Sequence, residues 1–205
     1  MKRVTSFVLT SIAAATLAGA LAGCAPLIIG GAAAGAALVV TDRRTSGAQL
    51  EDEGIELRGG ARLREAFGDH AHININSYNR MVLLTGEVPD EAARQRAEQV
   101  IGRVENVRSI VNELAVLGNS SLTQRSNDVL ISAKVKASLV DAKELQANAF
   151  RVVVERGTVY LMGRVTAAEA DRATQITRTV GGVQRVVRVF ETITPEELKA
   201  LQPSK

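Results

Sequence analysis

The pattern of apolar and polar positions along the chain occurs twice, with the two copies offset by about 77 residues. MVLLTGEV at 81–88 corresponds to TVYLMGRV at 158–165, and VENVRSIVNEL at 104–114 corresponds to VGGVQRVVRVF at 180–190. An offset of this length is too long for one unit of a solenoid. The pattern therefore predicts two copies of one small domain.

Each copy is predicted to contain a helix, a hairpin of two strands, a second helix and a last strand. Arg156-Gly157 between two apolar runs is a typical hairpin turn, and Ser77–Arg80 forms the corresponding turn in the first copy. The predicted boundaries are first helix 50–67 and 127–140, hairpin strands 72–76 with 81–86 and 151–155 with 158–163, and last strand 108–116 and 184–192.

The second helix of each copy has one apolar face and a recognisable start. Pro89 suits a first helical turn, and Thr166 with Glu169 fits a capping box. The apolar faces contain Ala93, Ala97, Val100, Ile101 and Val104 in one copy, and Ala170, Ala173, Ile176 and Val180 in the other. Because a strand–helix–strand unit crosses over to a parallel neighbour, we expect an α+β fold. Each copy should place two helices on one face of a three-stranded mixed sheet.

The first helices of the two copies differ on one face. Their shared stripe is predicted to face the core and contains Ile55, Gly59 and Leu63 in one copy, and Ile131, Val135 and Leu139 in the other. The roughly opposite stripe is apolar only in the second copy, where Val129, Leu130, Ala133, Ala137 and Val140 are flanked by Lys134 and Lys136. Its counterparts in the first copy are more polar: Glu53, Gly54, Leu57, Ala61 and Arg64. An apolar face beside lysines suits an anionic bilayer surface. Burial of this face against the first copy or the N-terminal segment is the alternative.

The N-terminus has the features of a secretory signal peptide. Lys2 and Arg3 precede an uncharged apolar run at about 7–22, and small residues follow. Leu21–Cys24 resembles the bacterial lipobox, in which the cysteine is acylated, for example with palmitate, and becomes the first mature residue. The alternative is a small buried thiol near an ordinary cleavage site. Cys24 is the only cysteine, so no intrachain disulfide is expected. Ala25 occupies the position where an Asp commonly retains lipoproteins in the inner membrane, so the resemblance points to the outer membrane.

The segment at 26–40 is apolar and rich in glycine, but it is shorter than the ~20 residues that span a membrane. We interpret it as a flexible tether near the lipid surface, with docking on a partner as the alternative. The expected organisation is signal peptide 1–23, lipidated cysteine and tether 24–49, first domain 50–117, linker 118–126, second domain 127–192 and C-terminal tail 193–205.

Composition argues against several classes of function. Removal of Lys2 and Arg3 with the signal peptide lowers the formal net charge from +3 to +1, and the chain has four Phe, two Tyr and no Trp. Nucleic-acid binding and base stacking are therefore not expected. His70 and His72 are the only histidines, and their spacing could place both on one strand face as metal ligands. No Cys is nearby, however, and carboxylates such as Asp69 are only sequence neighbours, so we expect no metal site and no cofactor. The sequence shows no evident pair of a nucleophile and a base. We therefore expect that the chain is not an enzyme and has no small-molecule substrate.

Gly86 and Gly163 end an apolar strand in each copy, and V-x-x-V-x-x-V-V runs, with Ile110 in place of one Val in the first copy, begin at Val104 and Val180. With the lipobox and Asp42–Gln49, this ordered pattern resembles the dual BON-domain outer-membrane lipoproteins. The resemblance covers about residues 50–192. It implies a non-enzymatic protein at the periplasmic face of the outer membrane that binds anionic phospholipid, through the first helix of the second domain, and maintains envelope integrity. The alternative is an adaptor for protein partners in envelope assembly or cell-wall remodelling. Gly86 and Gly163 are expected to be structural, at positions of close backbone approach.

Overall fold

The computed structural model describes residues 42–201, and Asp42 onward forms one compact unit. Cys24, the signal peptide and segment 26–40 lie outside the described residues. The first repeat contains α3 (Ser46–Phe67), a 3-10 turn (Gly68–His70), β1 (His72–Tyr78), β2 (Met81–Val88), α4 (Glu91–Gly102), β3 (Ser109–Asn112) and β4 (Ala115–Val116). The second contains α5 (Leu122–Asp141), a 3-10 turn (Ala147–Ala149), β5 (Phe150–Glu155), β6 (Thr158–Val165), α6 (Ala167–Thr179) and β7 (Arg185–Thr192), followed by α7 (Pro195–Leu201).

Both repeats have the predicted α+β topology. The central strand of each sheet, β2 or β6, pairs antiparallel with its hairpin partner and parallel with the last strand of the repeat. In the first repeat the last strand is divided into β3 and β4, both parallel to β2. Asn112 lies at this division, where its side chain accepts from the Leu114 N–H and donates to the Arg94 carbonyl of α4. The single strand predicted at 108–116 is therefore corrected to two short strands.

Two helices begin earlier than the apolar pattern predicted, because polar caps extend them. Thr45 accepts from the Ala48 N–H and starts α3 at Ser46. Ser121 and Gln124 form a reciprocal capping box that starts α5 at Leu122. The first turn of α5 therefore lies within the segment that was expected to be a linker, and the sequence S-x-x-Q was the signal for it.

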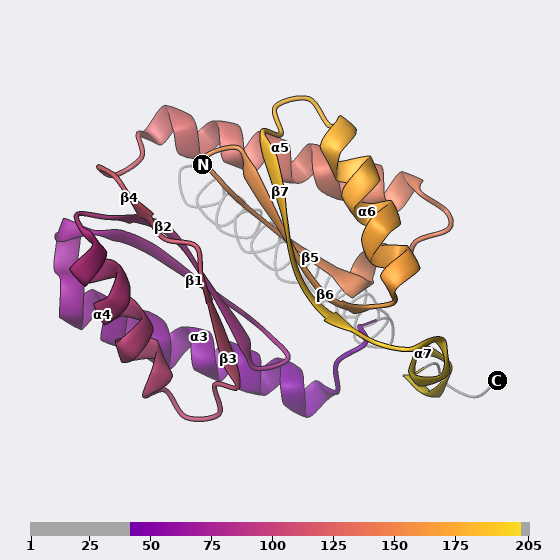
Figure 1. Ribbon diagram of the computed structural model, residues 1–205, viewed down its shortest axis with the longest axis horizontal. Coiled ribbons are helices and arrows are strands. Elements are labelled where there is room, and N and C mark those ends of the chain that lie inside the picture. Colours follow the sequence, from indigo (N-terminus) through magenta and orange to yellow (C-terminus); the bar gives the residue numbers. More distant parts are fainter. Residues whose placement is uncertain (1–41, 202–205) are drawn as a thin grey trace, which may run out of the picture. The chain divides into compact units, whose positions relative to one another are not determined.

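Each repeat has its own core between its helices and one face of its sheet. The predicted core stripes are buried, with Ile55, Val135 and Leu139 at most 1% exposed. In Figure 1, α3 and α4 lie beside the first sheet, and α5 and α6 lie beside the second. Both predicted helix pairs therefore cover one face of a sheet, as the sequence indicated.

The opposite faces of the two sheets pack against each other. Tyr78 and Leu83 from the first repeat form a buried cluster with Tyr160, Met162 and Val189 from the second. Side chains alternate along β2, so that Val82 and Leu84 belong to the first core while Leu83 faces the second sheet. This double burial explains why the central strands are almost continuously apolar.

Candidate functional site

The outward face of α5 is exposed. Val129, Leu130 and Val140 expose 68%, 59% and 67% of their surface, respectively. Leu122, in the first turn of the same helix, is 80% exposed. The other residues predicted for this face are also exposed: Ala133, Lys134, Lys136 and Ala137. The first repeat therefore does not bury the predicted lipid-binding stripe.

α5 is held against the protein by its inner face and by one buried carboxylate. Asp128 is 7% exposed and accepts hydrogen bonds of 2.8 Å from the N–H groups of Arg156 and Gly157. Those two residues form the hairpin turn and have φ values of 51° and 72°. The carboxylate thus provides hydrogen-bond acceptors for both N–H groups of the turn, whose backbone conformation is costly for Arg156.

Asp52 has the same role in the first repeat. Its carboxylate accepts from the N–H groups of Asn79 and Arg80 and from the Ser77 hydroxyl, each at 2.7 Å. The sequence analysis missed this pair of aspartates. The signal was a carboxylate three residues before the core positions Ile55 and Ile131 in both copies.

A hollow of about 420 Å³ lies beside the exposed stripe, between α5, the β5–β6 turn and the segment before β7. Leu130 and Lys134 line it from α5, Arg156 lines it from the turn, and Gln184 lines it from the other side. Apolar, cationic and amide groups therefore meet at one edge of the α5 face.

The corresponding face of α3 is more polar, as predicted. Leu50 and Leu57 are exposed, but charged residues lie between and after them on this helix. Arg58 forms an exposed ion pair with Glu51 at 2.9 Å. The two helices therefore present different chemistry to solvent from the same place in the repeat.

Gly86 and Gly163, which were predicted to end the central strands, instead lie two residues before the ends of β2 and β6, where the backbone of the neighbouring strand or turn approaches closely. A Cβ at Gly86 would collide with the His72 carbonyl oxygen, and one at Gly163 would collide with that of Ala149. Gly86 also has a φ of 114°, which side-chain-bearing residues rarely adopt. This geometry agrees with the structural role expected for both glycines.

Residues 43 and 44 join the N-terminal end of the described chain to both repeats. Arg43 is 7% exposed, forms a 2.6 Å ion pair with Glu169 and donates to the Arg164 carbonyl at 2.9 Å. Burial alone would raise the pKa of Glu169, but hydrogen bonds from Arg43 and Thr166 outweigh it and lower the pKa.

Arg44 contacts the first repeat. It forms a 2.8 Å ion pair with Asp52 and stacks 4.3 Å from the centre of the Tyr78 ring. Burial is the largest influence on Tyr78 and raises its pKa to about 12. Adjacent arginines thus fix the same short segment to the two repeats.

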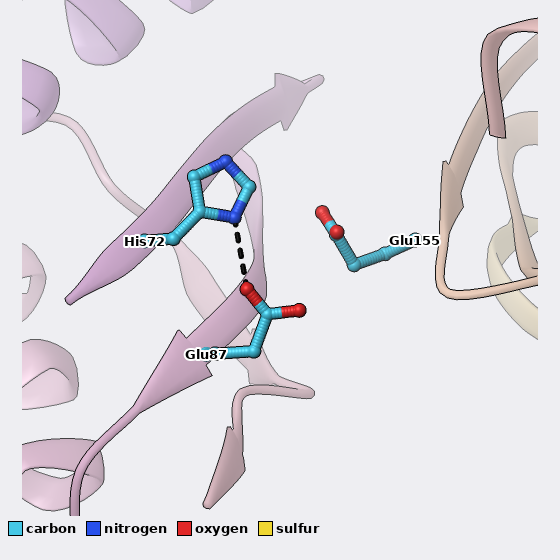
Figure 2. A group of neighbouring side chains, drawn as sticks. All are labelled: His72, Glu87 and Glu155. Atoms are coloured by element: carbon cyan, nitrogen blue, oxygen red, sulfur yellow. Dashed lines mark hydrogen bonds and ion pairs between the residues drawn. The ribbon is translucent and has the colours of Figure 1, made fainter. Parts of the chain in front are cut away.

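The structure also brings His72 together with two glutamates, Glu87 on the neighbouring strand and Glu155 on the second repeat (Figure 2). The imidazole Nδ1 of His72 lies 3.0 Å from Glu87 Oε2. Burial would raise the pKa of Glu87, but hydrogen bonds from Ser120 and His72 hold it below its usual value. For Glu155, burial prevails and raises the pKa. His70 lies outside this cluster, in an exposed turn.

Known proteins are similar to this chain in sequence. A family model described as BON domain matches residues 56–118 and 127–193. The chain is 35% identical over 173 residues to outer membrane lipoprotein DolP of Haemophilus influenzae, covering 83% of this chain and 89% of that protein. The 21 kDa hemolysin of Actinobacillus pleuropneumoniae is 32% identical over 154 residues, covering 74% of this chain and 79% of that protein. Osmotically-inducible protein Y of Escherichia coli is 28% identical over 140 residues, covering 64% and 70%.

None of these names denotes an enzyme, and the lack of catalysis stays a prediction. No helix within residues 42–201 is long and apolar enough to cross a bilayer.

Proposed function

We propose that this chain, which belongs to the BON-domain family and is a lipid-anchored protein of the outer membrane, binds anionic phospholipid through the outward face of α5. Binding at the periplasmic face would support the integrity of that membrane. The observation that carries the proposal is the exposure of three large apolar side chains, Val129, Leu130 and Val140, on one helix beside Lys134 and Lys136.

The size of the α5 face is consistent with reversible contact. Complete burial of a Val or Leu side chain contributes about 1.5–3 kcal/mol, and a lysine near an anionic surface contributes about 1 kcal/mol. Three partly exposed apolar side chains and two lysines therefore supply several kcal/mol, which is weak for a free protein. A lipid anchor at Cys24 would hold the domain at the surface and raise its effective concentration there.

The hollow beside Leu130 suits a phosphate headgroup. Lys134 and Arg156 line it and carry positive charge, and Gln124 and Asn127 add amide donors. The Asp128 carboxylate also lines it, but its oxygens already accept from the N–H groups of Arg156 and Gly157. A lipid whose acyl chains lie along the apolar stripe could place its phosphate in this hollow. This arrangement favours anionic over zwitterionic lipid, because a zwitterionic headgroup also carries a positive charge.

Vesicle co-sedimentation of the full chain, purified in neutral detergent and then freed of it, tests the proposal. The chain without an acylated cysteine is used, so that the anchor does not mask the α5 face. We expect binding to vesicles that contain phosphatidylglycerol, weaker binding to pure phosphatidylcholine, and a loss at high salt because charge attraction is screened over ~8 Å at physiological ionic strength. Equal binding to both vesicles, or none to either, would contradict lipid recognition and favour the protein adaptor.

A further inference from the structure

We propose that His72, Glu87 and Glu155 bind one divalent transition-metal ion, for which Zn²⁺ is the probe, and that this ion links the two repeats. His72 is on β1, Glu87 is on β2 and Glu155 ends β5 of the second repeat. One ligand atom of each residue lies within 4.8 Å of the others. Figure 2 shows the Glu155 carboxylate reaching from the second repeat toward the imidazole and the Glu87 carboxylate.

The charges of the cluster leave room for a cation. Glu87 is fully buried and Glu155 is only 7% exposed. Glu87 has His72 at 3.0 Å and the Arg156 guanidinium at 3.5 Å. Glu155 accepts from the Asn74 amide at 2.8 Å, and among residues 42–201 no cationic side chain forms an ion pair with it. A buried carboxylate without a cation is costly. A metal ion would therefore neutralise the negative charge of the two glutamates that Arg156 and His72 do not balance.

Two neighbours orient the carboxylates in the way that ligands are oriented in known metal sites. The Ser120 N–H donates to Glu87 Oε2 at 3.1 Å, and the Asn74 amide donates to Glu155 Oε2. The Asn74 hydrogen bond is to Oε2 of Glu155, and we place the metal at Oε1. Such supporting hydrogen bonds fix the direction of metal-binding carboxylates and imidazoles.

The surroundings also offer access and a fourth ligand. A hollow of about 250 Å³ is lined by His72, Asn74, Asp128 and Glu155. It is large enough for a water molecule, which commonly completes a site with three protein ligands.

The donor set indicates the class of metal. One imidazole nitrogen with two carboxylates suits Zn²⁺ and similar ions, whereas Mg²⁺ and Ca²⁺ prefer ligands that are all oxygen. Bonds to Zn²⁺ of about 2.0–2.2 Å place tetrahedral ligands roughly 3.5 Å apart. The donor atoms, which lie within 4.8 Å of one another, would therefore need to approach by up to about 1.3 Å.

The test is calorimetric titration of the full chain in neutral detergent, without a histidine tag, with Zn²⁺ and with Mg²⁺. Thermal melts of the same samples report stability. We expect one Zn²⁺ per chain and a rise of about 5–10 °C in Tm at a 100-fold excess over Kd. His72→Ala and the isosteric Glu155→Gln should each weaken Zn²⁺ binding at least tenfold, and His70→Ala should bind as the wild type does. Circular dichroism without metal checks that each variant is folded.

Three results would overturn the proposal. They are no stoichiometric Zn²⁺ binding by the wild type, equal binding by folded Glu155→Gln, and equal responses to Zn²⁺ and Mg²⁺. Loss of binding in His70→Ala but not in His72→Ala would place the ion elsewhere and would also contradict it. The Zn²⁺ titration does not measure lipid binding. A negative result would therefore contradict the metal site and leave the proposed function unaffected.

Discussion

Leu130 and Ile131 are neighbours in α5, but their side chains point about 100° apart around the helix and are 59% and 8% exposed, respectively. Ile131 packs in the core of the second repeat, while Leu130 lines the hollow together with Lys134 and Arg156. One helix therefore stabilises the fold with one face and offers an apolar surface with the other. A substitution at Leu130 should change the surface without opening a cavity.

The ion pair between Arg43 and Glu169 predicts a specific dependence of stability on pH. Because the pKa of Glu169 is lowered in the folded state, its stabilisation is present above its usual pKa of 4.5 and is lost as the pH falls through the folded value. Glu169→Gln should lower the free energy of unfolding by about 1–3 kcal/mol near neutral pH, because a charge-assisted hydrogen bond is lost. The difference from the wild type should shrink below about pH 4.5.

Urea unfolding from neutral to acidic pH measures this difference. Asp171→Asn is the control, because the ion pair of Asp171 with Arg188 is exposed and should change the free energy of unfolding by less than about 0.5 kcal/mol. A difference between Glu169→Gln and the wild type that stays constant with pH would contradict the account of Glu169.

The carboxylate of Asp128 is expected to be essential to the β5–β6 hairpin. Asp128→Ala removes two hydrogen-bond acceptors from the turn at Arg156 and Gly157. We expect a loss of about 3 kcal/mol in the free energy of unfolding, because buried N–H groups are left unsatisfied. Asp52→Ala should have a similar effect through the first hairpin. Unfolding in denaturant measures the free energy of unfolding of both variants. A loss below about 0.5 kcal/mol for either variant would contradict this role.

Gly163 should tolerate no side chain. The added Cβ of Gly163→Ala meets the Ala149 carbonyl oxygen, a backbone atom that cannot move away without shifting the β5 end. We expect a destabilisation of about 1–3 kcal/mol, typical of overpacking. Gly118→Ala is the matched control, since nothing lies within 4 Å of its added Cβ. Thermal melts of the two variants should differ clearly, and equal Tm values would show that the close approach is not restrictive.

Cys24→Ser should abolish lipid modification. The acyl chains form the expected anchor, and each buried methylene contributes about 0.8 kcal/mol to membrane attachment. Metabolic labelling with a radioactive fatty acid, followed by fractionation, should show label in the wild type only. Label that persists in the serine variant would exclude Cys24 as the modified residue.

Local patterns explain why much of the fold could be predicted from the sequence. The repeated apolar runs identified both domains, and the core stripe Ile131, Val135 and Leu139 followed from helical spacing. The turn at Arg156-Gly157 followed from residue type. The division of the last strand at Asn112 was not predicted, because it depends on contacts of this side chain with α4.

The two candidate sites also differ in how far the sequence could predict them. The exposed stripe around Leu130 was visible because it differs between two copies of one helix. The cluster of His72, Glu87 and Glu155 was not. His72 and Glu87 are cross-strand partners in the β1–β2 hairpin, but Glu155 meets them only when the sheets of the two repeats pack together. The spacing of residues along the sequence identified the two histidines but neither glutamate. Pairing of β1 with β2 brings Glu87 to His72, and packing of the two repeats adds Glu155.

The most direct measurement of the central claim compares Leu130→Glu with Leu57→Glu in vesicle binding. Both leucines are exposed on the first helix of a repeat, at 59% and 74%, so both variants should keep the wild-type circular dichroism. On vesicles containing phosphatidylglycerol, Leu130→Glu should lose binding at least tenfold, because a carboxylate resists the interface and repels lipid phosphate. Leu57→Glu should bind as the wild type does. Undiminished binding by folded Leu130→Glu, or an equal loss in both variants, would contradict α5 as the membrane face.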